Sequence, residues 1–132
     1  MSSEKRNELS QRIDKIEAAY EFMLAYAAQG HESDKDTDQG QEIRQYLNDI
    51  EAAADGLSTI TSIVAEEKNG DDARRFASFI DALESDAQKA RGAVALVLTQ
   101  DAISSLLIDN LNASIHLRAL LTDMFIVDEA LK

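Results

Sequence analysis

Apolar residues recur along this chain at alternating intervals of four and three, the spacing that places them on one face of an α-helix. The pattern occurs in four segments and predicts helices over about residues 3–29, 40–68, 71–99 and 101–131. In the first segment the repeating positions are Leu9, Ile13, Ile16, Tyr20, Met23 and Ala27. We therefore expect an all-α protein.

Short breaks separate these segments. Gly30 suits the end of the first helix, and Asn69 with Gly70 suits the end of the second. Glycine and asparagine adopt the left-handed conformation that commonly follows a helix. Asp71 or Asp72 is then expected to cap the N-terminus of the third helix.

Two positions are less clear. Thr99 or Asp101 can cap the fourth helix, but the region contains neither glycine nor proline. A short turn, which we favour, and one continuous helix over residues 71–131 therefore both fit it. Gly56 is expected to weaken the second helix by about 1 kcal/mol without ending it.

Four long helices with short connections are typical of an up-down-up-down four-helix bundle. We predict such a bundle as a single domain covering residues 1–132.

The amino-acid composition agrees with a helical bundle and excludes several kinds of functional site. The 132 residues include no proline, five glycines and no cysteine. The absence of cysteine excludes disulfides, zinc–thiolate sites and thiol catalysis. The charged start of the chain is not followed by the apolar core of a signal peptide, and no run of 18 apolar residues occurs. We expect a soluble, cytoplasmic protein.

The formal net charge is −12, from 25 acidic and 13 basic side chains. Such a charge repels phosphate groups, so neither nucleic acid nor a membrane surface is expected as a partner. Residues 31–69 are the most acidic part, with ten acidic and three basic side chains. We interpret this stretch as a solvated face, with docking of a basic partner as the alternative.

The stretch "HESDKDTDQGQE" at residues 31–42 has the acidic character of a calcium loop. Counted from Asp34, aspartates fill positions 1, 3 and 5 of an EF-hand pattern. Position 6 is Gln39 instead of glycine, and position 12 is Gln45 instead of the bidentate glutamate. We therefore predict a solvated connector and no metal site.

His116 is the stronger of the two histidines as a candidate for proton or phosphoryl transfer. Histidine phosphotransfer modules carry lysine and then glycine shortly after the histidine, whereas Ala119 and Leu120 stand here. We expect His116 to be a surface residue hydrogen-bonded to Asn112, one turn earlier.

Carboxylate motifs offer limited support for metal chemistry. No Glu-x-x-His sequence occurs, which excludes the di-iron centre of ferritin-like bundles. Pyrophosphohydrolases of the MazG type hold magnesium with pairs of acidic residues on helices. The comparable pairs here are Asp14 with Glu17 and Asp81 with Glu84. We expect exposed side chains at these positions and no cofactor.

The fourth segment is apolar around more of its circumference than a bundle needs. Its apolar side chains span roughly 260°, whereas a stripe facing a core needs little more than 100°. The stripe expected in the core consists of Ile103, Leu106, Leu107, Leu117, Leu121 and Met124. A second stripe consists of Ile108, Leu111, Ile115 and Ile126. Because contiguous exposed apolar residues mark interaction sites, we predict that the second stripe forms an isologous homodimer interface.

Three other residues complete the predicted interface. Arg118 lies between the two stripes and is expected to pair across the seam with Asp128 or Glu129. Phe22 and Tyr26 lie outside the repeating positions of the first segment, so an interface role and a core role are equally compatible with them. The predicted function is that of a non-enzymatic, acidic interaction protein, such as an adaptor, a chaperone-like protein or a regulatory subunit. The alternative is a small metal-dependent nucleotide hydrolase or a histidine phosphotransfer module.

Overall fold

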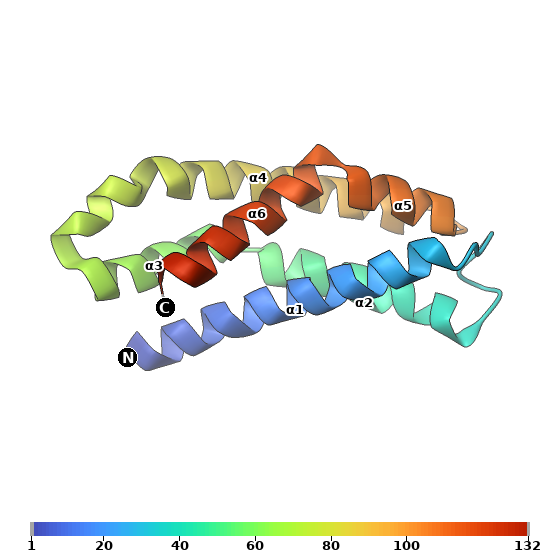
Figure 1. Ribbon diagram of the computed structural model, residues 1–132, viewed down its shortest axis with the longest axis horizontal. Helices are drawn as coiled ribbons and strands as arrows, with labels where there is room; N and C mark the ends of the chain where they lie inside the picture. The colour runs from blue at the N-terminus through green and yellow to red at the C-terminus, as the bar shows by residue number, and fades with distance from the viewer. Residues whose placement is uncertain (1, 132) are drawn as a thin grey trace.

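The computed structural model describes residues 2–131, with their side chains except those of Ser2, Ser3 and Gln39. Within this range the regular elements are all helical and no β-strand occurs. They are α1 (Ser2–Ala28), α2 (Asp38–Ala54), α3 (Leu57–Asn69), the 3₁₀ helix η1 (Gly70–Phe76), α4 (Ala77–Leu98), α5 (Ser105–Ala113) and α6 (Ile115–Ala130) (Figure 1). The predicted all-α class is confirmed.

The helices pack around one elongated apolar core. α1 packs against α2, α3 and α5, while α4 packs against α6, α2 and α3. Buried apolar side chains from all six α-helices contribute to the same core. In Figure 1, α1 begins and α6 ends at the end of the molecule where α3 passes into η1. Two of the predicted helices are divided, so an arrangement of four uninterrupted helices is not confirmed.

The expectation that Gly56 would not end a helix is wrong. α2 ends just before it, and Gly56 adopts a left-handed φ of 74°. Carbonyl groups at the end of α2 find partners on α1, because Arg12 Nη1 donates to Ala53 O at 3.1 Å and also to Asp55 O. Glycine permits the turn, and Arg12 binds carbonyl groups that a helix end leaves without helical partners.

Ser114 divides the fourth predicted helix into α5 and α6. Its backbone leaves the helical conformation (ψ 131°), and its hydroxyl group accepts a hydrogen bond from the amide two residues ahead. Residues 99–104, upstream, form the turn that we favoured over a continuous helix. Ser104 caps the helix that follows, and neither Thr99 nor Asp101 does so.

The break at Asn69 and Gly70 occurs where it was predicted, and Gly70 has a φ of 58°. The element that follows is different from the prediction. Residues 70–76 form a 3₁₀ helix, so neither Asp71 nor Asp72 caps an α-helix. Runs of 3₁₀ helix longer than four residues are uncommon, and no residue of η1 is buried.

The acidic connector at residues 31–42 is not solvated throughout, because Asp34 is buried. Its carboxylate accepts a hydrogen bond from Arg44 Nε at 2.6 Å and another from the amide of Ile103 at 2.8 Å. Arg44 also donates to carbonyl groups at the end of α4 and in the turn after it. This ion pair therefore joins the α1–α2 connector to the α4–α5 connector.

The environment of Asp34 favours its charged form. Burial by itself raises the pKa of the carboxyl group, but hydrogen bonds from Arg44 and the Ile103 amide outweigh it, and the pKa lies below its ordinary value. Gly40 lies against the same loop: a Cβ atom there would be 2.3 Å from Asp34 O. Only glycine fits this approach.

Further hydrogen bonds tie the same connectors together. Tyr26 Oη donates to Ile103 O at 2.7 Å, and Ser105 Oγ donates to Tyr26 O at 2.7 Å. The His31 amide donates to Ser105 Oγ, and the Ser105 amide donates to His31 O, both at 2.8 Å. We call these contacts, together with the Asp34–Arg44 pair, the clasp.

Replacing Arg44 with methionine should lower the free energy of unfolding by about 3 kcal/mol, because Asp34 would remain buried without its counter-ion. Urea denaturation at fixed protein concentration measures this loss. Arg75→Met is the matched control, since Arg75 is exposed on η1 and its change should be within about 0.5 kcal/mol. Equal losses in the two variants would mean that the ion pair does not stabilise the fold.

Candidate interaction surfaces

The structure separates the residues predicted at an interface by their burial. Three of them lie in the core of the single chain: Tyr26, Ile108 and Leu111. The expectation of an exposed surface is wrong for Ile108 and Leu111, and of the two roles left open for Tyr26 the structure shows the core role. Three others are exposed: Ile115, Arg118 and Ile126. Phe22 is half-buried and stacks on Tyr46 of α2, with ring centroids 4.3 Å apart, so it belongs to the contact between α1 and α2.

The break at Ser114 explains why Ile108 and Leu111 are buried. α5 and α6 each bury a single narrow face. If residues 105–130 formed one continuous helix, with about 100° between successive residues, the buried face of α5 and the buried face of α6 would point in directions roughly 150° apart. Leu106, which was expected in the core, is 69% exposed for the same reason. The apparent excess of apolar circumference comes largely from adding the faces of two helices.

An exposed apolar surface nevertheless remains on α6. We define the outer face of α6 by the residues Ile115, Arg118, Ala119, Thr122, Phe125 and Ile126. Ile115 is 74% exposed, Phe125 52% and Ile126 49%. The structure describes every residue from 115 to 126, and the only exposed charged side chain among them is Arg118. This face is thus apolar and weakly basic on an acidic protein.

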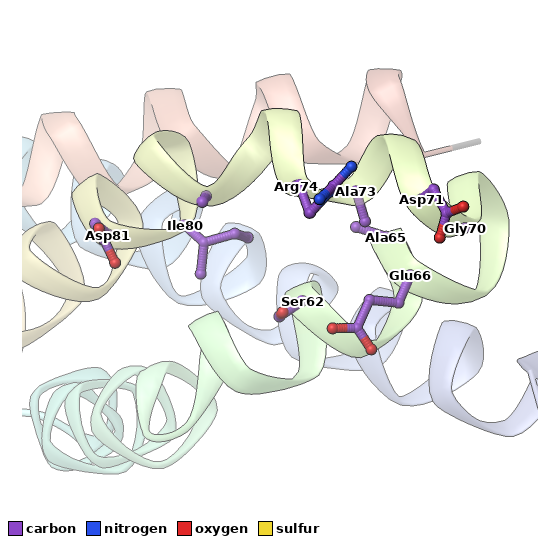
Figure 2. Close-up of a pocket in the computed structure, with 10 residues that line it drawn as sticks. Ser62, Ala65, Glu66, Gly70, Asp71, Ala73, Arg74, Ile80 and Asp81 are labelled. Carbon is purple, nitrogen blue, oxygen red and sulfur yellow. The ribbon is translucent and has the colours of Figure 1, made fainter.

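A second candidate surface is a hollow of about 550 Å³ between α3 and the η1–α4 segment (Figure 2). One wall consists of Ser62, Ala65 and Glu66, and the other of Gly70, Asp71, Ala73, Arg74, Ala77, Ile80 and Asp81. Figure 2 shows the Ile80 side chain projecting between the two walls. Most of these side chains are small and leave the space between the walls unfilled. We call this space the α3–α4 hollow.

An apolar pocket of about 220 Å³ adjoins α6 and shares Ala65 and Ile80 with the α3–α4 hollow. Its other lining residues are Thr61, Phe76, Phe79, Ile126, Val127, Ala130 and Leu131. Phe76 and Phe79 are only half-buried. Both hollows therefore lie beside the hairpin formed by α3, η1 and α4.

Asp86 of α4 and Asp123 of α6 form a carboxyl pair in the contact between these helices. Asp123 Oδ2 is buried and accepts no hydrogen bond from a donor in the described part of the chain. Burial, a hydrogen bond with Asp86 and the negative charge of Asp86 together raise the pKa of Asp123 to about 7. One proton shared by the two groups would satisfy the buried oxygen.

The candidate catalytic residues do not assemble into a site. His116 is exposed, as expected, but Asn112 is buried and donates to Met23 O at 3.2 Å instead of bonding to the histidine. The expected His116–Asn112 contact is wrong, because Asn112 connects α5 to α1.

The two carboxylate pairs have different neighbours. Burial raises the pKa of Glu17, and the charge of Asp128 on α6 raises it further. Glu84 instead accepts a hydrogen bond from Ser58 of α3 at 2.6 Å. Within residues 2–131, no group of three or more histidine, cysteine or acidic side chains has the geometry to hold a metal ion.

Pattern analysis missed Phe125, the α3–α4 hollow and the Asp86–Asp123 pair. Phe125 is recognisable as an outer-face residue only once the helix break at Ser114 is known. The alanines of the hollow carry no polar signal, and the two aspartates meet only because α4 packs against α6.

Comparisons with protein families, with curated protein sequences and with solved structures found nothing that matches this chain. No helix in the described residues is long and apolar enough to cross a membrane.

Asp123→Asn should stabilise the protein more at pH 8 than at pH 5. The raised pKa means that folded Asp123 keeps its proton up to about pH 7, whereas the unfolded chain loses it near pH 3.8. The stability that this proton contributes is complete below that lower value and is lost as the pH rises through about 7. Asparagine stays neutral at both pH values.

Melting temperatures of Asp123→Asn and the parent protein at pH 5 and pH 8 test this expectation. Asp109→Asn, at an exposed position of α5, is the control and should show the same difference from the parent at both values. A pH-independent effect of Asp123→Asn would contradict the shared proton.

Proposed function

We propose that this chain is a non-enzymatic interaction protein that forms a homodimer through the outer face of α6. The observation that carries the proposal is the exposure of Ile115, Phe125 and Ile126 on a single helix. Exposed apolar side chains on one face of a helix favour association, because contact with another protein removes them from water.

The distribution of charge favours a second copy as the occupant. Two chains of net charge −12 repel each other at most contacts. The outer face of α6 avoids this repulsion, because its only exposed charged residue is Arg118. Asp123 lies beside this face, and its raised pKa keeps it largely uncharged below about pH 7.

The spacing of the residues also suits a two-fold symmetric contact. Ile115, Ala119, Thr122 and Ile126 follow one another at intervals of four, three and four. When two copies of α6 run antiparallel about a centre between Ala119 and Thr122, Ile115 of one copy lies opposite Ile126 of the other. The small residues at the centre allow the helices to approach closely, at the crossing angle of about 20° that this spacing favours.

The proposal also covers the arrangement of the helices. We infer an up-down-up-down four-helix bundle in which α2 with α3, and α5 with α6, each take the place of one helix. The packing of α1 on both α2 and α3 supports it. A magnesium-dependent hydrolase would need its carboxylates to share one metal ion. Glu17 lies near Asp128, whereas Glu84 accepts a hydrogen bond from Ser58, so an interaction protein is favoured.

Sedimentation velocity of the parent protein and of Ile115→Glu/Ile126→Glu tests the dimer. A contact between two helices buries less than the roughly 800 Å² per partner of a standard interface, so we expect a dissociation constant in the micromolar range. Sedimentation is therefore measured at protein concentrations from about 5 to 500 μM. The parent should shift from monomer to dimer over this range. The double variant should stay monomeric, because four buried carboxylates would oppose association.

Leu96→Glu is the matched control, since Leu96 is a similarly exposed residue on α4 and should leave the dimer intact. Circular dichroism should show both variants folded. A parent protein that stays monomeric at 500 μM, or a double variant that dimerises like the parent, would overturn the proposal.

A further inference from the structure

The α3–α4 hollow has the dimensions of a trough. Its η1–α4 wall extends from Gly70 to Asp81. Seven residues of 3₁₀ helix and five of α-helix give this wall a length of roughly 20 Å. A helix of three to four turns has the same length, at about 5.4 Å per turn. The shape suits a rod-like occupant better than a compact small molecule.

The long wall presents three apolar side chains to the hollow. They are Ala73 of η1 and Ala77 and Ile80 of α4. Ala65 of the α3 wall is buried, whereas Ala77 is exposed. Because three of these four side chains are alanines, the backbone of another helix can approach closely.

The rim of the hollow is acidic. Glu66, Asp71 and Asp81 are exposed around it, and Arg74 is the one basic side chain in its lining. Figure 2 shows Glu66 on the α3 wall and Asp71 and Asp81 near the two ends of the opposite wall. Carboxylates on both walls complement basic side chains that flank an apolar stripe on an incoming helix.

The η1 segment suits a wall that adapts to an occupant. It is a seven-residue 3₁₀ helix without a buried residue. Segments with few buried contacts open at low free-energy cost, and 3₁₀ stretches of this length often mark hinges. A bound helix would give η1 the apolar contact that the core does not provide.

We propose that the α3–α4 hollow binds a basic amphipathic helix of a partner protein. The apolar face of that helix packs against Ala73, Ala77 and Ile80, and its lysine or arginine side chains pair with the rim carboxylates. This is the helix-in-groove mode of recognition. The hollow contains no residue of the outer face of α6, so this inference does not depend on the homodimer.

The test uses a fluorescein-labelled, 18-residue helical peptide made of leucine and lysine, with leucines at helical spacing. A peptide with glutamate in place of lysine is the charge control. Fluorescence anisotropy in 150 mM NaCl measures binding to the full-length protein. The lysine peptide should bind, and the glutamate peptide should not, because the rim repels it.

Two pairs of variants locate the binding site. Ala77→Trp fills the hollow and should weaken binding about tenfold, whereas Ala82→Trp, at an exposed position of α4 outside the lining, should not. Glu66→Gln/Asp81→Asn should weaken binding and flatten its salt dependence. Glu21→Gln/Asp109→Asn removes two exposed carboxylates elsewhere and should have little effect.

Backbone amide NMR shifts caused by the lysine peptide should centre on residues 62–81. Ile115→Glu/Ile126→Glu should bind the peptide as the parent does, which separates this site from the dimer face. Four results would each overturn the proposal. They are no binding, equal binding of both peptides, an unaffected Ala77→Trp variant, and equal weakening by the two carboxylate pairs.

Discussion

Burial of the Asp34 carboxylate is the constraint that organises one end of this protein. A buried carboxylate needs a counter-ion and hydrogen-bond donors, and Arg44 and the Ile103 amide supply them. Because these groups come from α2 and from the turn before α5, satisfying one charge fixes two connectors together. The Tyr26 and Ser105 hydrogen bonds then hold α1 to the same turn.

The two ends of the molecule differ in packing. In Figure 1 the α1–α2 and α4–α5 connectors meet at one end, and α3 passes into η1 at the other. Polar contacts hold the first end, whereas two voids flank the hairpin at the second. The proposed occupant of the α3–α4 hollow would therefore bind at the end that the clasp does not hold.

Charge and exposure together separate the two candidate surfaces. The outer face of α6 is mainly apolar with a single arginine, while the α3–α4 hollow combines apolar side chains with three carboxylates and one arginine. In a chain of net charge −12, this difference is the basis for proposing a copy of the same chain at the first surface and a basic partner at the second. A homodimer and a partner complex would therefore not compete for the same residues.

The sequence by itself determined the all-α class, the stop at Gly70 and most core positions of α1, because each depends on local helical spacing or local backbone preference. Only the tertiary structure decided the break at Gly56, where Arg12 binds the helix end, and the burial of Asp34. It also decided which side of α5 faces inward, since the turn at Ser114 resets the direction of the buried face. A periodic pattern specifies the apolar side of one helix, but the relative rotation of two helices depends on contacts with distant segments.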